Sequence, residues 1–489
     1  MLIASCGGGG STSSYQLNDL NQIVQPSPLF NTDPIKIIDA VSYYSHACND
    51  PSFQFLIPVN INEDSYTDFI AHFWCDSASP AVYNNKPTPD ALVAYVSNNF
   101  GQYTIENMNV FGEIEAKLGG ASRKYDRGDI NGDGNDDFAF AMNWEDGRSS
   151  FDNNSIISNY AKPTILLSRN YGYEVIKLGF DDWGHSVRIQ NNKVFFAGHS
   201  SQVFEYIDTS WNDISYNYPK LSFASFLLYN NYIINSVRKD SSQGLELIKD
   251  KKVISSIMME ESFKVNFESW NNSGTSNYNE LGIYKIRGEY YFDGMISEMC
   301  KKDDLIVATI NASKLESGEI IEGGYYSEDD TIPVVMFAFY KIENEELKEV
   351  DIDIVNEEIN HNFNFFDCFD VNKDQKKDIV AQVFSQQWNS QDNNKGVPEI
   401  YINDDGTYFN LDTSAWPRYS YNDDSQGFLF DIDANGTSDL VIFPLKIGGS
   451  GIIEIYTTNK NITDQYYFNL KFKLNILNRA KLMITCTYE

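Results

Sequence analysis

The apolar residues of this chain occur in short runs, and the stretches between them are rich in Asn, Asp and Gly. A short apolar run bounded by turn-forming residues is typical of a β-strand rather than a helix. In three places an apolar run, a polar stretch, a Pro and a second apolar run follow in that order, and a turn through Gly101, Gly172 or Gly406 leads to a further strand. This pattern predicts meanders of short antiparallel strands joined by hairpin turns. The clearest runs are residues 69–74, 91–95, 138–142, 165–167, 379–383 and 400–402.

Four polar segments of nine residues, which begin at residues 60, 129, 370 and 431, share one pattern. Positions 1, 3, 5 and 9 are always Asp or Asn, position 2 is Ile or Val, and two apolar residues follow position 9. Asp/Asn/Gly turns are common in β proteins, but four copies with matched flanks indicate a repeated unit. The residues at the four polar positions are, in chain order, Asn60, Asn62, Asp64 and Asp68; Asp129, Asn131, Asp133 and Asp137; Asp370, Asn372, Asp374 and Asp378; and Asp431, Asp433, Asn435 and Asp439.

The spacing of these side chains suits a hard cation. Calcium takes about six to eight oxygen ligands, and Asp and Asn at alternate positions of a tight loop direct their oxygens toward one point. Glycine at position 6 permits a left-handed turn, and Gly134 and Gly436 satisfy this, whereas Ser65 and Gln375 do not. We expect those two loops to bind more weakly or to hold strain. An EF-hand is excluded, because it needs a Glu at position 12 and flanking helices, and neither is present. The sequence thus predicts calcium at all 16 polar positions.

The spacing of the loops predicts further units that lack the polar residues. The first two loops and the last two begin about 60–70 residues apart, whereas the middle gap is about four times as long. That gap has room for three unmarked units, which makes seven units in all. Traces of strands are visible there at residues 191–196, 226–231, 244–247, 303–307 and 333–337.

The loops and their continuation through Pro, a strand and a Gly turn resemble FG-GAP/VCBS repeats, which occur in integrin α-subunits and in bacterial surface proteins. The resemblance covers roughly residues 50–460, with a weak match over 190–350. It implies an all-β fold, a seven-bladed β-propeller of four-stranded antiparallel blades, with calcium loops at the blades. A ring of blades also buries both faces of each sheet and leaves only short exposed edges. A strand near the N-terminus could complete a blade with residues 452–456 and 466–468.

The charge balance narrows the possible partners. The chain has 69 acidic against 37 basic residues, a net charge of −32, which disfavours a nucleic-acid partner. The hydrophobic content of 42% is too high for a wholly disordered chain. No apolar run approaches the ~20 residues that a membrane-spanning helix needs. Residues 471–489 differ from the acidic body of the chain, because they are basic and apolar. We expect them to form a C-terminal tail or a closing strand.

The N-terminal residues resemble a lipoprotein start. Residues 3–6 read Ile-Ala-Ser-Cys, which is similar to a bacterial lipobox with Cys6 as the lipidated residue, and a Gly/Ser tether follows up to residue 14. A basic start and a longer apolar stretch, typical of an export signal, are missing. From the lipobox-like residues and the tether we nevertheless expect a lipid anchor in the cell envelope. An extension or linker would follow over residues 15–49, and a propeller over residues 50–470.

The remaining cysteines are odd in number, so at least one stays free if the others pair. Cys48 and Cys75 are close in sequence and are one candidate pair, while buried free thiols are an equal alternative. The residues involved are Cys48, Cys75, Cys300, Cys368 and Cys486.

These features favour a lipid-anchored, calcium-stabilised module that binds a glycan or a partner protein outside the cell. An alternative is a carbohydrate-active enzyme, such as a polysaccharide lyase or a glycosidase, on a propeller scaffold. No catalytic residue can be assigned, because the chain has no nucleophile elbow, zinc-protease sequence or dinucleotide fingerprint. A third hypothesis is an assembly subunit without a soluble ligand.

Overall fold

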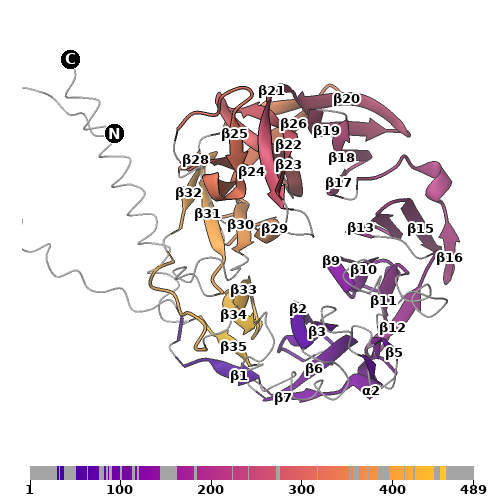
Figure 1. Cartoon of the computed structure of the whole chain (residues 1–489). Helices are drawn as coiled ribbons and strands as arrows, with labels where there is room; N and C mark the ends of the chain where they lie inside the picture. Colours follow the sequence, from indigo (N-terminus) through magenta and orange to yellow (C-terminus); the bar gives the residue numbers. More distant parts are fainter. Residues whose placement is uncertain are drawn as a thin grey trace, which may run out of the picture.

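The computed structural model describes residues 30–37, 51–143, 162–355, 363–383, 396–444 and 452–458, with short gaps inside these ranges. Over them the chain is a β-propeller of four-stranded antiparallel blades arranged around a central axis (Figure 1). No helix in the described part is long and apolar enough to cross a membrane. The expected anchor residue Cys6, its tether and residues 459–489 lie outside the described residues.

Six of the sheets are built on four antiparallel strands, which are given below from the innermost strand outward. In the sixth of these sheets the outermost strand is β1, the first strand of the chain. The sheet after the N-terminal strand has β2 (Pro51–Val59), β3 (Asp68–Cys75), β6 (Ala91–Asn99) and β7 (Gln102–Ile105), with β8 (Ala116–Lys117) beside β6. The next has β9 (Ala121–Gly128), β10 (Asp137–Asn143), β11 (Thr164–Ser168) and β12 (Tyr173–Lys177). Two more consist of β13 (Ser186–Gln190), β14 (Lys193–Ala197), β15 (Ser201–Ile207) and β16 (Ser210–Asp213), and of β17 (Phe226–Tyr229), β18 (Tyr232–Lys239), β19 (Ser242–Lys249) and β20 (Lys252–Met259). The fifth has β29 (Phe363–Phe369), β30 (Asp378–Val383), β31 (Glu399–Asp404) and β32 (Thr407–Asn410), with β28 (Ile354–Val355) parallel to β32. The sixth has β33 (Ser425–Phe430), β34 (Asp439–Pro444), β35 (Ile453–Tyr456) and β1 (Ile35–Ile37).

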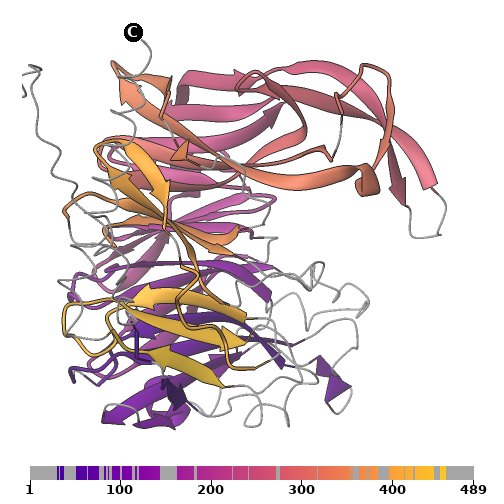
Figure 2. The same cartoon turned by 90° about the vertical axis from the view of Figure 1, so that its left-hand side faces the viewer.

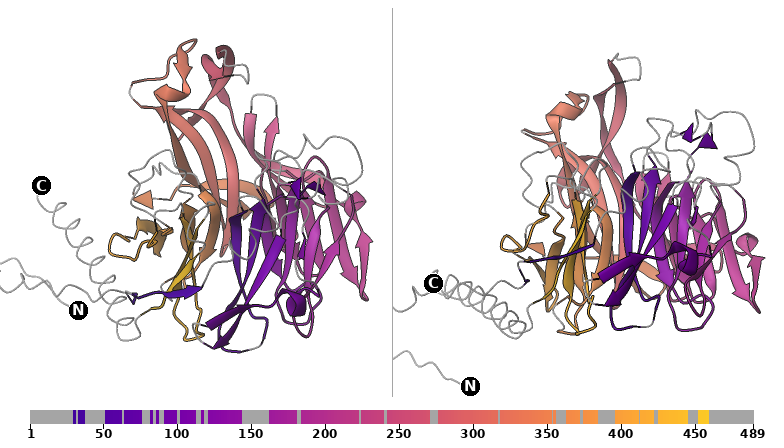
Figure 3. Two further views of the ribbon diagram at one scale, coloured as in Figure 1. Left: turned by 60° about the horizontal axis from the view of Figure 1, so that its bottom comes forward. Right: turned by 90° about the horizontal axis from the view of Figure 1, so that it is seen from below.

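One sheet is larger than the others and has seven strands in the order β25-β21-β22-β23-β24-β26-β27. Its strands β21, β22 and β25 form an arm that projects from one face of the ring (Figures 2 and 3). The bounds are β21 (Glu261–Trp270), β22 (Ser276–Ile286), β23 (Glu289–Lys302), β24 (Leu305–Leu315), β25 (Tyr325–Ser327), β26 (Thr331–Glu343) and β27 (Glu346–Val350). The short elements that remain are a two-stranded pair, β4 (Val82–Tyr83) and β5 (Lys86–Pro87), the helix α2 (Asn107–Val110), and the 3-10 helices η3 (Ser215–Asn217) and η4 (Glu328–Asp330).

The ring closes on a strand from the N-terminal side of the chain. β1 pairs with β35 as the outer strand of the last sheet, with Ile35 opposite Ile455 and Ile37 opposite Ile453. The expected joining of an N-terminal strand to residues 452–456 is thereby observed, and it draws part of the segment 15–49 into the fold. Residues 466–468, the other expected partner, lie outside the described residues.

Three sheets fill the long gap between the second and third polar loops, where the spacing predicts three unmarked units. The strand traces read from the sequence there fall on β14, β17, β19, β24 and β26. At the corner where the marked sheets carry a nine-residue loop, these three sheets have a two-residue turn. Asn191, Asn230 and Asp303 adopt positive φ values of 53°, 54° and 50° there. Asn and Asp tolerate this left-handed conformation better than other non-glycine residues, which explains their presence in these turns.

The core lies between neighbouring sheets, because each blade buries one face against the next. One such cluster joins Phe69, Phe73 and Tyr95 of one sheet to Val441 and Ile455 of the last sheet. Full burial of a large apolar side chain contributes about 1.5–3 kcal/mol, so the contacts between blades provide the main driving force for closing the ring.

A disulfide joins Cys300 of β23 to Cys368 of β29, the inner strands of neighbouring blades. Both residues are buried. The structure therefore pairs two cysteines that are 68 residues apart, and the Cys48–Cys75 pair considered above stays a prediction. Cys48 and the side chain of Cys75 lie outside the described residues.

Candidate metal sites

The four polar loops occupy the same place in four different blades. Each connects the innermost strand to the second strand: β2 to β3, β9 to β10, β29 to β30, and β33 to β34. The four turns are therefore equivalent corners of the ring. The first and fourth loops also touch, since the N–H of Thr67 donates to the carbonyl of Ile432 over 2.9 Å.

The Asp at position 9 has the same surroundings in all four loops. Its side chain is fully buried and accepts one hydrogen bond from the N–H of position 2 and another from an N–H in the third strand or two residues beyond it. In the second loop, Ile130 donates to Asp137 over 2.6 Å and Ser168 donates over 2.6 Å. The matching pairs of donors are Ile61 and Ser97 to Asp68, Val371 and Asn403 to Asp378, and Ile432 and Thr458 to Asp439. This carboxylate ties the loop to the blade.

Burial disfavours the charged form of these carboxyls. It raises the pKa of Asp68 and of Asp378 to about 6 and that of Asp439 to about 7, although backbone hydrogen bonds act in the opposite direction. The pKa of Asp137 is raised for the same reason. Each loop therefore carries a buried carboxyl group whose charged form is costly.

The other polar positions fold the loop back on itself. In the second loop, Asp129 accepts from the N–H groups of Gly132, Asp133 and Gly134. Asp370 and Asp431 accept from positions 5 and 6 of their own loops in the same way. Position 5 accepts from the N–H of position 7 in all four loops. These short-range bonds explain why the pattern of Asp and Asn alone specifies the turn.

Position 6 is left-handed in three loops. Gly134 and Gly436 both have φ of 86°, and Gln375 has φ of 70°. A non-glycine residue in this region carries strain of about 1 kcal/mol, so the expected strain is present in the third loop. Ser65 is not among the residues with positive φ, and in the first loop the amide of Asn60 donates to the carbonyl of Asp64.

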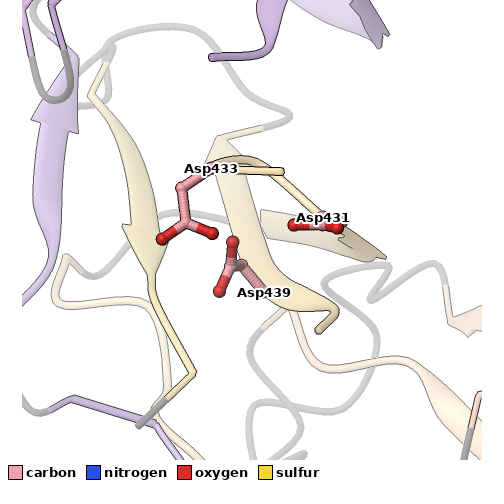
Figure 4. Close-up of side chains that lie close together, drawn as sticks. All are labelled: Asp431, Asp433 and Asp439. Carbon is pink, nitrogen blue, oxygen red and sulfur yellow. The ribbon is translucent and has the colours of Figure 1, made fainter. Parts of the chain in front are cut away.

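The loops differ in how their oxygens are arranged. In the fourth loop, one oxygen each of Asp431, Asp433 and Asp439 lies within 4.8 Å of the other two (Figure 4). In the first and second loops position 3 is an Asn whose amide N–H donates to the position-5 carboxylate, Asn62 to Asp64 over 3.0 Å and Asn131 to Asp133 over 2.9 Å. That amide would have to turn over to offer its oxygen to a cation. The sequence pattern is most complete in the second loop, whereas among the described residues three carboxylates converge in the fourth.

The third loop has basic neighbours. Lys376 pairs with Asp405 over 2.8 Å, and Lys377 donates to the carbonyl of Lys301. Lys302 is buried, and burial lowers its pKa, although the nearby Asp303 and Asp378 oppose the shift. A positive charge near Asp378 reduces the attraction of this loop for a cation. Asn372 lies outside the described residues.

Sequence reasoning missed the residues that hold the position-9 carboxylate from the third strand. They are Ser97, Ser168, Asn403 and Thr458. A signal was present, because each is a small polar residue, and three of them immediately precede the turn that contains the expected Gly. Since the backbone N–H makes the bond, the side-chain type alone does not reveal the role.

A second group of charged side chains meets on the inner strands. Glu298 of β23 lies 2.5 Å from the ammonium of Lys124 on β9 and 4.0 Å from the guanidinium of Arg188 on β13. Lys124 also donates to the carbonyl of Ala224 over 3.1 Å. Asp126, next on the same side of β9, accepts from the N–H of Ile189, and burial raises its pKa despite nearby Arg188. These contacts link inner strands of separate blades across the ring.

No family model matches the chain, and no curated protein matches it. Solved structures that resemble it include the computationally designed Ika8 protein, at 8% identity and a TM-score of 0.37 over 84% of this chain and 98% of that one. The N-terminal domain of Nup159 is similar at 10% identity and a TM-score of 0.37, over 88% of this chain and 99% of that one. YCF48 bound to D1 peptide shows 12% identity and a TM-score of 0.22 over 62% of this chain and 87% of that one. Likenesses this distant carry no argument about activity or ligands.

Proposed function

We propose that this chain is a calcium-stabilised binding module that acts outside the cytoplasm, held to a membrane by a lipid on Cys6. Its calcium would bind at the four polar loops, and its ligand would be a glycan or a partner protein. The observation that carries the proposal is the repetition of one hydrogen-bonded loop, with one buried carboxylate, at the same corner of four blades.

A divalent cation suits these corners for an electrostatic reason. A buried carboxylate costs free energy unless a positive charge is close, and calcium accepts several carboxylate and amide oxygens at once. In the fourth loop, Asp431, Asp433 and Asp439 already converge, and the carbonyl of Thr437 at position 7 would add a ligand. Because such a cation binds only the folded chain, its role would be structural, not catalytic.

Two features support export. A buried disulfide between blades persists in oxidising compartments and is rare in the cytosol. The lipobox-like residues at the N-terminus point to the same destination. We also infer that the seven-stranded sheet is the seventh blade, since β23, β24, β26 and β27 pair from the inside outward in the same way as the strands of the other blades.

The anchor is testable by fractionation. Expressed with an export signal in a bacterium, the full chain is expected to sediment with membranes, because a lipid chain inserts into the bilayer. Cys6→Ser removes the acceptor thiol and should release the protein into the soluble fraction. Membrane retention of the Cys6→Ser chain would contradict the anchor.

Binding is to be separated from catalysis by parallel assays. We expect the purified chain to be retained on a glycan array or to capture an envelope protein, and to release no shortened sugars from polysaccharides. Loss of capture by the chelated chain would connect ligand binding to the loops. Saturable release of sugar products would instead establish the enzyme alternative.

A further inference from the structure

The arm of the seven-stranded sheet has one buried face. Val265, Ile283 and Phe292 form its small core, and Phe267 and Tyr326 pack against them. The ring of Phe292 contacts Phe267 and Tyr326, each with centroids 5.5 Å apart. Successive residues of a strand point to opposite faces, so the neighbours of these residues lie on the other, outer face of the arm.

That outer face exposes two tyrosines side by side. Tyr278 of β22 and Tyr325 of β25 are 52% and 70% exposed, and their ring centroids are 5.3 Å apart. Neither ring contributes to the core of the arm. Tyrosine pairs of this kind are enriched in protein interfaces, because a rigid ring provides contact area with little loss of side-chain entropy.

The arm is strongly acidic. Residues 260–292 and 316–330 contain 11 acidic and 3 basic side chains, a net charge of −8. One of the lysines, Lys264, is already paired with Glu280 on the outer face over 3.4 Å. A partner for this surface must therefore be basic and must bring apolar side chains to cover the rings.

One segment of this chain has that chemistry. Residues 471–489 contain four basic and one acidic side chain, a net charge of +3, whereas the rest of the chain carries −35. Aliphatic residues lie between the basic ones, among them Leu474, Ile476 and Leu477. The segment lies outside the described residues and follows Thr458, where the described chain ends.

The topology favours a segment from a second copy. Thr458 lies on the face of the ring that carries the polar loops, because its hydroxyl donates to the carbonyl of Ser438. The turn at Asp303 between β23 and β24 is on that face, so the arm, which joins the opposite ends of these strands, lies on the other. Residues 459–470 span at most about 40 Å. β23 alone, which runs from that face to the arm, has 14 residues and is therefore roughly 46 Å long.

We propose that the outer face of the arm is a docking surface for residues 471–489 of a second copy of this chain. Tyr278 and Tyr325 provide the apolar contact, and the surrounding carboxylates select the basic segment. The chain therefore self-associates through its tail.

The first experiment measures self-association by sedimentation of the full chain. Four proteins are compared: the unchanged chain, a chain that ends at residue 470, the double variant Tyr278→Ser/Tyr325→Ser, and the control Tyr216→Ser. Tyr216 is 78% exposed and belongs to η3, not to the strands of the arm. Tyr216→Ser therefore also removes an exposed tyrosine ring but leaves the arm unchanged. We expect concentration-dependent association of the unchanged chain and the control, and its loss in the other two. A monomeric unchanged chain, or association that survives truncation, overturns the proposal.

The second experiment uses a synthetic peptide of residues 471–489 with the chain that ends at residue 470. We expect saturable binding of the peptide. The double variant should bind it about tenfold or more weakly, because two central aromatic contacts are lost. Tyr216→Ser should bind it as the unchanged surface does. Added salt should weaken binding, because the charge contribution is screened. Equal binding of a scrambled peptide of the same composition, or unaltered binding by the double variant, overturns the proposal.

Discussion

Calcium is expected to raise the melting temperature of the chelated protein by several degrees or more. A ligand that binds only the folded state adds about 2.7 kcal/mol per site at 100 times its dissociation constant. With up to four such loops the total would be the largest single effect proposed for this chain. Calorimetry in chelator, in calcium and in magnesium measures it. Equal melting with and without chelator would contradict the metal assignment.

Substitutions in individual loops provide the matched controls. Asp133→Ala should abolish one site and reduce the calcium-dependent stabilisation more than Asp64→Ala, because the first loop carries Asn60 and Asn62 in place of carboxylates. Asp433→Ala should have at least as large an effect as Asp133→Ala, since its loop already gathers three carboxylates. The reverse order, with Asp64→Ala the most damaging, would sink this ranking of the loops.

Removal of the disulfide is expected to destabilise the ring by about 4 kcal/mol, the chain-entropy value for a closed loop of roughly 70 residues. Cys300→Ser/Cys368→Ser therefore lowers the melting temperature, and a reductant lowers that of the unchanged chain but not that of the variant. The bond joins the inner strands of two neighbouring blades, so its loss frees the contact between them. Peptide mapping under non-reducing conditions checks the pairing, and two free thiols at these positions in protein from an oxidising compartment would refute it.

The calcium and disulfide effects are not wholly independent. Cys368 is at the end of β29, two residues before Asp370 opens the third loop. We expect the cysteine variant to lose calcium affinity at this loop more than at the other three, since neighbouring sites couple whereas distant ones add.

Much of the fold was readable because its turns are local. The Asp and Asn side chains of each loop bond to N–H groups within the same nine residues, so the sequence pattern alone predicts the turn and the strand that follows. The three sheets in the long gap have no such loops, and a two-residue turn such as Asn191-Asn192 carries little information about where their strands begin.

The ranking of the loops was less predictable. The second loop fits the pattern at every position, but its Asn131 amide donates to the Asp133 carboxylate. The orientation of that amide depends on the hydroxyl and carbonyl of Ser168, on another strand. No short window of sequence contains both residues.

The sequence by itself determined most of the strands and the corners at the polar loops, because hydrogen bonds over a few residues encode them. Only the tertiary structure decided that Cys300 meets Cys368, that Glu298 meets Lys124, and that β21, β22 and β25 extend one sheet into an arm. Each of these contacts joins residues remote along the chain. The packing of the blades around the axis decides which of these residues meet, and that packing depends on the whole ring and not on a short segment of sequence.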